Sequence, residues 1–468
     1  MPRSLPNRLL VILFTLLLAA CMPGNISTAD QVATSVAATL QADGQPVPTA
    51  EPTLGEVATQ APTEPACANA GLTSVAYVKD GDVWLWVQGG MRTQLTTFGD
   101  VQDLSISDNG CRIAYTRSVP NPMHDPAVEF VAPETLNELW VVSSDGTSSR
   151  ALVDTAYLSA QPVPVGDNIV SVLRFEFQPR SHTLAFNTQM LHPGVGLTIR
   201  NDINLVNVDS GSITTLLGVE QAGGIFVFSP DGLQVAFSTP TSVGVINTDG
   251  SFLRRDLITF PMVITYSEYL YSPPLHWSQA SNSLMVAIPP ADGLAEGMPE
   301  TALWWIPLDG TPAFEAGSVQ TAFFVIGEVV FSPDAGRIAY LRPIGEPGSG
   351  MTELVVALSD GSNESPVISD PAAQFLAWSP DSSRYLYAYM DSGLRLGLAS
   401  AADSSTTLLA SLAGASPFAV QAEWVDASRF LLLEQGEGGA TLSLMDTAGL
   451  AEVIESFSTP FVAFDAAP

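Results

Sequence analysis

The sequence predicts an all-β fold, a β-propeller of four-stranded blades, preceded by a lipoprotein signal and a disordered tether. Three observations predict it. A turn motif recurs seven times between residues 106 and 424, at intervals of 46 to 71 residues, and repeats of about 50 residues made of short strands are typical of propellers. Short apolar runs, not long helical patterns, follow each copy. The chain also contains 37 glycines and 35 prolines, which suits a fold with many turns.

The repeated motif is an aromatic or apolar residue, a polar turn and a second apolar run. The aromatic residue ends an inner strand, the turn (often Ser-Pro-Asp) closes a hairpin, and the following run begins the second strand. The clearest copies are Phe228–Phe237, Phe331–Tyr340 and Trp378–Tyr387, and weaker copies begin at Ile106, Phe177, Trp277 and Trp424.

A third and a fourth strand complete each repeat. The third strands end in a turn that contains Asp-Gly, as in Leu139–Gly146, Leu303–Gly310 and Leu354–Gly361. An outer strand follows, for example Thr406–Ala410. Four strands per repeat make one propeller blade.

The two ends of the repeat array predict how the ring closes. Three strand-like runs precede the first motif, Ser74–Val78, Val83–Val87 and Thr93–Thr97, and a single run, Phe461–Phe464, follows the last repeat. Pairing the last run with the first completes an eighth blade and removes an exposed sheet edge. We expect eight blades; seven is the alternative if the N-terminal runs pack elsewhere.

The Ser-Pro-Asp-Gly hairpin and the Leu-Trp-Val-Val strand that precedes Asp145-Gly146 resemble the repeats of TolB-type (WD-like) propellers. Similar repeats form the propeller of dipeptidyl-peptidase-type serine peptidases. The resemblance covers nearly all of residues 73–465 and implies the fold, while propellers host unrelated functions. No Gly-x-Ser-x-Gly motif occurs, so the hydrolase domain of those peptidases is not expected. A low-complexity segment stands where TolB has an α/β domain.

The N-terminal region predicts export and lipid anchoring. Residues 1–20 form the signal, with Arg3 and Arg8 ahead of the apolar run Leu9–Leu18. Leu18-Ala-Ala-Cys21 resembles a bacterial lipobox, which makes Cys21 the lipidated residue; an ordinary cleaved secretory signal is the alternative. Residues 21–71 form an Ala/Thr/Pro-rich tether, and residues 72–468 the propeller. The expected location is extracytoplasmic, on a bacterial membrane or envelope, with the N-terminal lipid in that membrane.

Cys67 and Cys111 are the other two cysteines. Cys111 lies in a hairpin on the bottom face of the propeller, and Cys67 enters the neighbouring blade from the same face. We expect a disulfide that fixes the tether to the ring in an oxidising compartment; two unpaired thiols are the alternative.

Composition excludes several classes of function. The chain has 48 acidic and 17 basic residues, a net charge of −31, which disfavours binding to nucleic acid. Lys79 is its one lysine, so no P-loop is present. The four histidines (His124, His182, His192 and His276) have no metal-pair spacing, and Asp80-Gly81-Asp82 lacks the ligand spacing of a calcium loop. We expect no cofactor, no metal and no catalytic residue.

Long connections predict a recognition surface. Insertions at 117–137, 187–202, 289–300 and 342–351 lie between second and third strands, and an aromatic-rich stretch at 260–277 joins two blades. Propeller topology brings both kinds of connection to the top face, so we expect binding there. The candidate ligand-binding residues are Tyr266, Tyr269, Tyr271 and His276. The alternative is that these loops only cap the ring.

Two classes of function remain. The first is a monomeric, non-enzymatic, membrane-tethered module that binds a protein or an envelope polymer through its top face. The second is a lyase or hydrolase with its site in the central channel. A bound metal, or His192 and His276 meeting near the axis, would favour the enzyme.

Overall fold

The computed structural model describes residues 67, 69, 71–127, 133–163, 168–193, 197–221, 224–263, 270–292, 300–321, 329–345, 351–369, 373–414, 416–436, 438–460 and 462–468. They all belong to the compact unit that includes Glu56–Pro468. The expected signal and Cys21 lie outside the described residues, as does nearly all of the tether.

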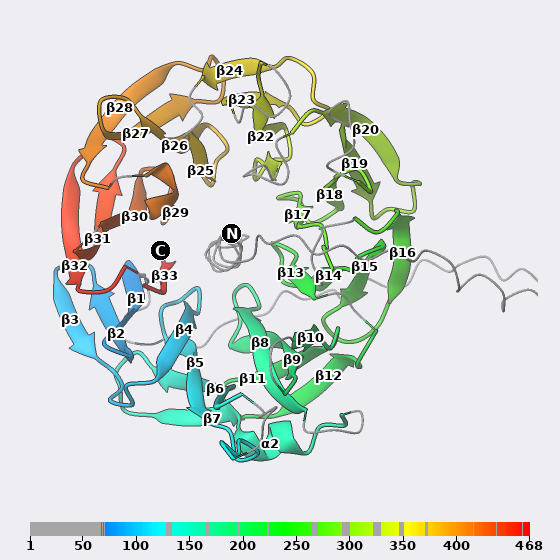
Figure 1. The fold of residues 1–468 in the computed structure, drawn as a ribbon, viewed down its shortest axis with the longest axis vertical. Helices are drawn as coiled ribbons and strands as arrows, with labels where there is room; N and C mark the ends of the chain where they lie inside the picture. Colours follow the sequence, from blue (N-terminus) through cyan, green and yellow to red (C-terminus); the bar gives the residue numbers. More distant parts are fainter. Residues whose placement is uncertain are drawn as a thin grey trace, which may run out of the picture. The chain divides into compact units, whose positions relative to one another are not determined.

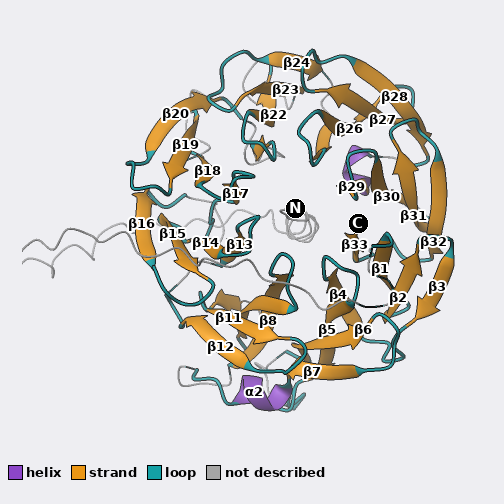
Figure 2. Ribbon diagram, turned by 180° about the vertical axis from the view of Figure 1, so that it is seen from behind, coloured by secondary structure: helices purple, strands orange, loops and turns teal. Residues whose placement is uncertain are grey.

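Eight antiparallel sheets stand in a ring, and each is one blade (Figures 1 and 2). Blade 1 contains β33 (Phe464–Ala467), β1 (Ser74–Lys79), β2 (Asp82–Val87) and β3 (Met91–Gln94). Blade 2 contains β4 (Val101–Ile106), β5 (Arg112–Pro120), β6 (Thr135–Ser143) and β7 (Ser149–Val153). Blade 3 contains β8 (Ile169–Phe177), β9 (Thr183–Leu191), β10 (Leu197–Ile199), β11 (Ile203–Asn207) and β12 (Ile213–Leu217). Blade 4 contains β13 (Ile225–Phe228), β14 (Gln234–Ser238), β15 (Ser242–Asn247) and β16 (Arg254–Thr259).

The second half of the chain continues the pattern. Blade 5 contains β17 (Leu275–Trp277), β18 (Ser283–Ile288), β19 (Thr301–Pro307) and β20 (Phe314–Val319). Blade 6 contains β21 (Val330–Phe331), β22 (Arg337–Pro343), β23 (Thr352–Leu358) and β24 (Ser365–Ile368). Blade 7 contains β25 (Gln374–Trp378), β26 (Arg384–Met390), β27 (Leu394–Ser400) and β28 (Thr406–Leu412). Blade 8 contains β29 (Val420–Trp424), β30 (Arg429–Gly436), β31 (Gly439–Asp446) and β32 (Ala451–Phe457). The predicted propeller of eight blades is confirmed, and the alternative of seven is wrong.

The ring closes where β33 pairs with β1, from Ser74 opposite Ala467 to Tyr77 opposite Phe464. The predicted run Phe461–Phe464 was placed too early, because the paired residues are Phe464–Ala467. Upstream of them the chain still contacts β1, since the Ala463 carbonyl accepts the Val78 N–H at 2.8 Å.

The predicted strand Thr93–Thr97 ends earlier, at Gln94. The carboxylate of Asp82 explains the difference. It accepts the Thr96 hydroxyl at 3.0 Å and the N–H groups of Phe98 and Gly99 at 2.6 and 3.2 Å. These bonds turn the chain toward blade 2, because local side-chain acceptors compete with strand pairing.

Each inner strand from blade 2 to blade 8 ends at the residue that begins the sequence motif. The serine of Ser-Pro-Asp closes the hairpin. In blade 4 the Ser229 hydroxyl donates to Asp231 Oδ1 at 2.6 Å and accepts the Gln234 N–H at 2.9 Å. Blades 6 and 7 repeat this pair of bonds at Ser332 and Ser379. The motif is therefore a turn closed by its own serine, whose buried hydroxyl donates one hydrogen bond and accepts another.

Tryptophan anchors join neighbouring blades. Trp277 donates its indole N–H to the Val227 carbonyl of the preceding blade at 3.1 Å, Trp378 to Val330 at 3.0 Å and Trp424 to Ala377 at 3.4 Å. Apolar clusters fill the space between adjacent sheets, as where Val227 of blade 4 and Leu275 of blade 5 share one cluster. An amphipathic ring thus supplies both the apolar filling and the polar link of a blade junction.

The two short helical segments of the described residues lie between blades. α2 (Thr155–Ser159) follows blade 2 and begins at Asp154, whose carboxylate accepts the Tyr157 N–H at 2.8 Å. The 3₁₀ turn η1 (Pro417–Ala419) precedes blade 8. Neither segment, nor any other helix among the described residues, has the length and apolar character needed to cross a membrane.

Candidate functional site

Connections on the top face carry most of the exposed apolar side chains. In each blade the second strand runs up to this face, and so does the fourth, so the loops between strands two and three and between blades meet there. Of sixteen large apolar side chains that are exposed in the described part of the chain, nine lie in these connections: Phe98, Met123, Val163, Leu197, Val219, Met262, Leu270, Met351 and Phe418. Exposed apolar groups gathered on one side are typical of an interaction surface.

Parts of the predicted insertions are ordered strand. The β5–β6 hairpin stays paired out to Pro120 opposite Thr135, and the insertion in blade 3 adds β10, which pairs with β9. Strand pairing gives these loops a fixed base, which favours a preformed surface over one that must order on binding.

An arginine clamp supports the top of blades 1 and 2. Arg117, on β5, forms two hydrogen bonds with the Asp100 carboxylate, each 2.8 Å. Its guanidinium carbon lies 3.7 Å from the centre of the Phe98 ring and 4.7 Å from that of Trp140. Trp140 donates its indole N–H to Glu138 at 2.8 Å. The hydrogen bond and charge of Asp100 outweigh partial burial and raise the pKa of Arg117, so the clamp stays ionised.

The four predicted ligand-binding residues are not all in the described region. Tyr266 and Tyr269 lie outside it. Tyr271 is described, in the connection between blades 4 and 5, and is partly buried. His276 lies within β17 and not in a top-face loop. Sequence reasoning missed the methionine and leucine side chains of the top face, because exposure of a single apolar residue in a loop leaves no periodic signal.

Three of the histidines have structural partners: His182 and His192 flank β9 in blade 3, and His276 lies in blade 5. His182 contacts Asp209 at 2.8 Å, and His192 contacts Asn168 at 3.0 Å. His276 Nε2 donates to the Ser332 carbonyl at 2.9 Å, and its ring stacks on Phe331 with centroids 5.9 Å apart. Within the described residues, no three His, Cys, Asp or Glu side chains are grouped so that they could hold a metal ion.

The bottom face carries the strand hairpins and the disulfide. Cys67 and Cys111 are bonded, with their Cα atoms 5.6 Å apart. Several hairpins between third and fourth strands contain an aspartate that accepts hydrogen bonds from the turn it closes, as at Asp145, Asp249 and Asp360. At Asp145 the Ser143 hydroxyl and the Thr147 N–H and hydroxyl lower the pKa to about 2. The pKa values of Asp249 and Asp360 are lowered by the same kind of bonds, so these carboxylates are ionised at neutral pH.

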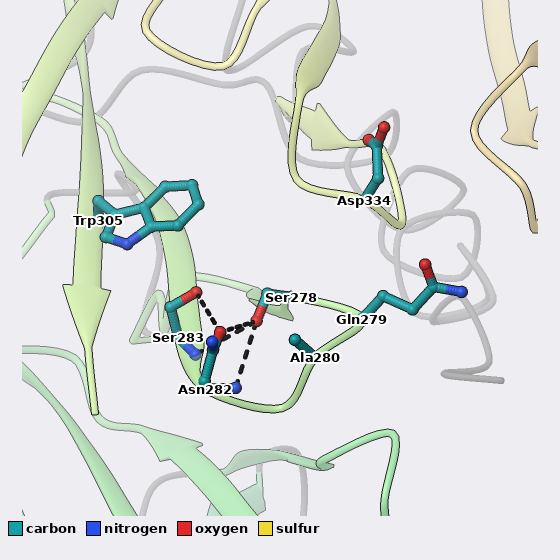
Figure 3. Close-up of a pocket in the computed structure, with 7 residues that line it drawn as sticks. All are labelled: Ser278, Gln279, Ala280, Asn282, Ser283, Trp305 and Asp334. Carbon is teal, nitrogen blue, oxygen red and sulfur yellow. Dashed lines mark hydrogen bonds between the residues drawn. The ribbon is translucent and has the colours of Figure 1, made fainter. Parts of the chain in front are cut away.

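A cleft of about 470 Å³ opens on the bottom face between blades 5 and 6. It is lined by Ser278, Gln279, Ala280, Asn282 and Ser283 of the blade 5 hairpin, by Trp305 of β19 and by Asp334 of the blade 6 hairpin. Figure 3 shows Trp305 on one side and Asp334 on the other, with the hairpin turn as the floor. Three floor residues bond to one another, as Asn282 Oδ1 accepts the hydroxyls of Ser278 at 3.0 Å and Ser283 at 3.4 Å.

Comparison with solved structures finds propellers. An oligogalacturonate lyase in complex with manganese is 12% identical, with a TM-score of 0.45 over 74% of this chain and 85% of that chain. Dipeptidyl peptidase 4 of Porphyromonas gingivalis is 10% identical, with a TM-score of 0.47 over 81% of this chain and 56% of that chain. TolB of Acinetobacter baumannii is 9% identical, with a TM-score of 0.35 over 77% of this chain and 84% of that chain. In its fold the chain is similar to the TolB-like propellers.

No family model matches the sequence, and no curated protein matches it either. At 9 to 12% identity, the similarity of the TolB-like propellers to this chain concerns the fold alone. The function therefore has to be argued from the surfaces of this propeller.

Burial of His276 predicts a pH dependence of stability. Burial lowers the pKa of His276 to about 4, although the Ser332 carbonyl and Asp334 act in the opposite direction. In the unfolded chain the pKa of a histidine is about 6.5, so between pH 6.5 and 4 the unfolded state binds a proton that the folded state does not. This part of the stability is fully present above pH 6.5 and is lost as the pH falls. We expect a loss of about 2 kcal/mol at pH 4.5.

Urea unfolding at pH 7.5 and 4.5 measures this effect, with the variant His276→Gln as the control. The variant cannot titrate, so the aspartates act equally on both proteins and the difference between them isolates His276. Equal pH dependence in the two proteins would contradict the prediction.

Proposed function

We propose that the protein is a non-enzymatic propeller, tethered outside the cytoplasm by an N-terminal lipid, that binds a protein or an envelope polymer through its top face. The observation that carries the proposal is that nine exposed apolar side chains lie in the top-face connections. A partner that covers them removes apolar area from water, which contributes about 25 cal/mol per Å².

The position of Cys67 supports the orientation. The disulfide to Cys111 holds the start of the propeller at the bottom face. A tether that begins there starts on the side opposite the long connections, so a partner can reach them. The net charge of −31 favours a partner that is neutral or basic, since like charges repel.

The test measures how much envelope material is crosslinked to each of two triple variants of the full chain in a detergent extract of the cell envelope. The top-face variant carries Met123→Ser, Leu270→Ser and Phe418→Ser, whose parent side chains are 46%, 61% and 39% exposed. The control variant carries Met91→Ser, Phe314→Ser and Leu450→Ser at outer and bottom positions that are 64%, 50% and 72% exposed. Both remove similar apolar area and leave the core unchanged.

The top-face variant is expected to bind envelope material on the order of a hundredfold more weakly than the parent protein, since about 1 kcal/mol is lost for each of the three truncated side chains. The control variant is expected to match the parent. If all three proteins retain equal amounts of envelope material, the top face is not the binding surface.

A further inference from the structure

Side chains bridge the bottom hairpins at seven of the eight blade junctions. These bridges come from different residue types, but each links the first hairpin of one blade, or the chain just before β1, to the next blade. They are Cys67–Cys111, Arg180 N–H to Asp108 (2.8 Å), Gln178 to the Gly232 carbonyl (2.7 Å), Asp231 N–H to Ser281 (3.1 Å), Asp334 N–H to Ser382 (2.9 Å), Arg384 to the Ala427 carbonyl (2.8 Å) and Arg429 to Thr73 (3.0 Å).

The junction of blades 5 and 6 lacks a bond between its two hairpin turns; it is joined instead from β17, where His276 Nε2 donates to the Ser332 carbonyl at 2.9 Å. Among the described residues, no hydrogen bond joins the turn at 278–283 to the turn at 332–337. One substitution within the repeat explains it. In blades 5 and 7 a serine at the fourth turn position, Ser281 or Ser382, accepts the backbone N–H of the preceding blade's turn. Blade 6 has Ala335 there, so the Ala280 N–H has no hydroxyl to bind.

The cleft described above lies between these two unbonded hairpin turns. Its walls hold polar groups that make no hydrogen bond to a described residue. The donors are the N–H groups of Trp305 Nε1, Asn282 Nδ2, Gln279 Nε2 and the Ala280 backbone. The acceptors are Gln279 Oε1 and Asp334 Oδ2, since Asp334 Oδ1 is occupied by Ser332 and Gly336.

This inventory selects the chemistry of the ligand. A ligand that satisfies four donors and two acceptors must itself offer several acceptors and several donors, which is the property of a polyhydroxylated molecule. The indole of Trp305 supplies a flat apolar wall for the C–H face of a sugar ring. A cation would find only one unoccupied carboxylate oxygen and would face four N–H groups, whose dipoles repel it.

We propose that the cleft between blades 5 and 6 binds a neutral saccharide of about two sugar units. The sugar lies against Trp305, accepts from the Ala280 N–H and Asn282, and donates to Asp334. This site is on the face opposite the top connections and does not depend on the function proposed for them. The exposed position of Ala280 and Asn282 favours weak binding, with a Kd on the order of 1 mM.

Restoring the absent bridge tests the proposal without damaging the fold. Ala335→Ser places a hydroxyl where Ser281 and Ser382 carry one. The backbone at Ala335 has φ +61°, close to the φ of +58° and +59° at those two serines, so serine is accommodated. The new hydroxyl is expected to accept the Ala280 N–H and to close the cleft. Arg384→Ala is the control, because it removes the bridge between blades 7 and 8 and changes no hydrogen bond of a cleft residue.

Binding of cellobiose, maltose and N,N′-diacetylchitobiose to the full chain in detergent is measured by saturation-transfer NMR, up to about 50 mM sugar. At least one sugar is expected to bind, with about tenfold weaker binding to Ala335→Ser and to Trp305→Ala, and with unchanged binding to Arg384→Ala. Failure of all three sugars to bind overturns the proposal. So does equal binding to the parent and Ala335→Ser, or displacement of the sugar by choline or arginine, which would show a cation site.

Discussion

A chain that ends at Ser458, and so lacks β33, is expected to lose more than about 5 kcal/mol of unfolding free energy and to aggregate. All four residues of β33 are buried. Loss of the Phe464 side chain alone is expected to cost about 3–5 kcal/mol. Asp465 also links blades 1 and 2, accepting the Ser105 hydroxyl and the Ile106 N–H, each at 2.8 Å. Without the strand, β1 becomes an unpaired sheet edge.

Urea unfolding and size-exclusion chromatography measure the effect of the truncation. A chain that ends at Ala467 is the control, because it lacks only the exposed Pro468 and should behave as the full chain does. The variant Asp465→Asn keeps the strand but removes the charge, and is expected to lose about 1–3 kcal/mol. Equal unfolding midpoints for the truncated and full chains would contradict closure by β33.

Removing the disulfide is expected to cost up to about 4 kcal/mol. The bond closes a loop with a sequence separation of 44 residues, and the chain-entropy estimate for a loop of that size is about 4 kcal/mol at 25 °C. The variant Cys67→Ser removes the bond and leaves the buried Cys111 in place. The unfolding free energy in urea, measured with and without dithiothreitol, gives the cost.

Reductant should destabilise the parent protein and leave Cys67→Ser unchanged. Cys21→Ser, which keeps both disulfide cysteines, should respond to reductant as the parent does. An unfolding free energy for Cys67→Ser equal to that of the oxidised parent would mean that the bond contributes nothing to the propeller.

The blade repeat could be predicted from sequence because its signals are local. The residues of Ser229-Pro-Asp-Gly bond within one turn, so the turn, the strand end at Phe228 and the next strand follow from a few adjacent positions. The predicted end of a strand was wrong where a side chain from another strand forms hydrogen bonds with the chain at that point. Asp82 ends β3 from another strand, and no pattern within residues 93–97 reveals it.

The sites were harder to predict because they are made between blades. His276 was expected on the binding surface, yet it packs against Phe331 of the next blade and donates to Ser332. A single aromatic-rich segment does not show which way each side chain points, since alternate residues of a strand face opposite sides.

By itself the sequence determined the fold class, the number of blades and the way the ring closes, because hydrophobic spacing and turn chemistry act over a few neighbouring residues. Only the tertiary structure decided which turns touch. Ala280 and Ala335 are 55 positions apart, and each is an ordinary residue in its own repeat. Their combined effect, two neighbouring hairpin turns with no bond between them and a cleft beside Trp305, exists because the ring sets one turn against the next.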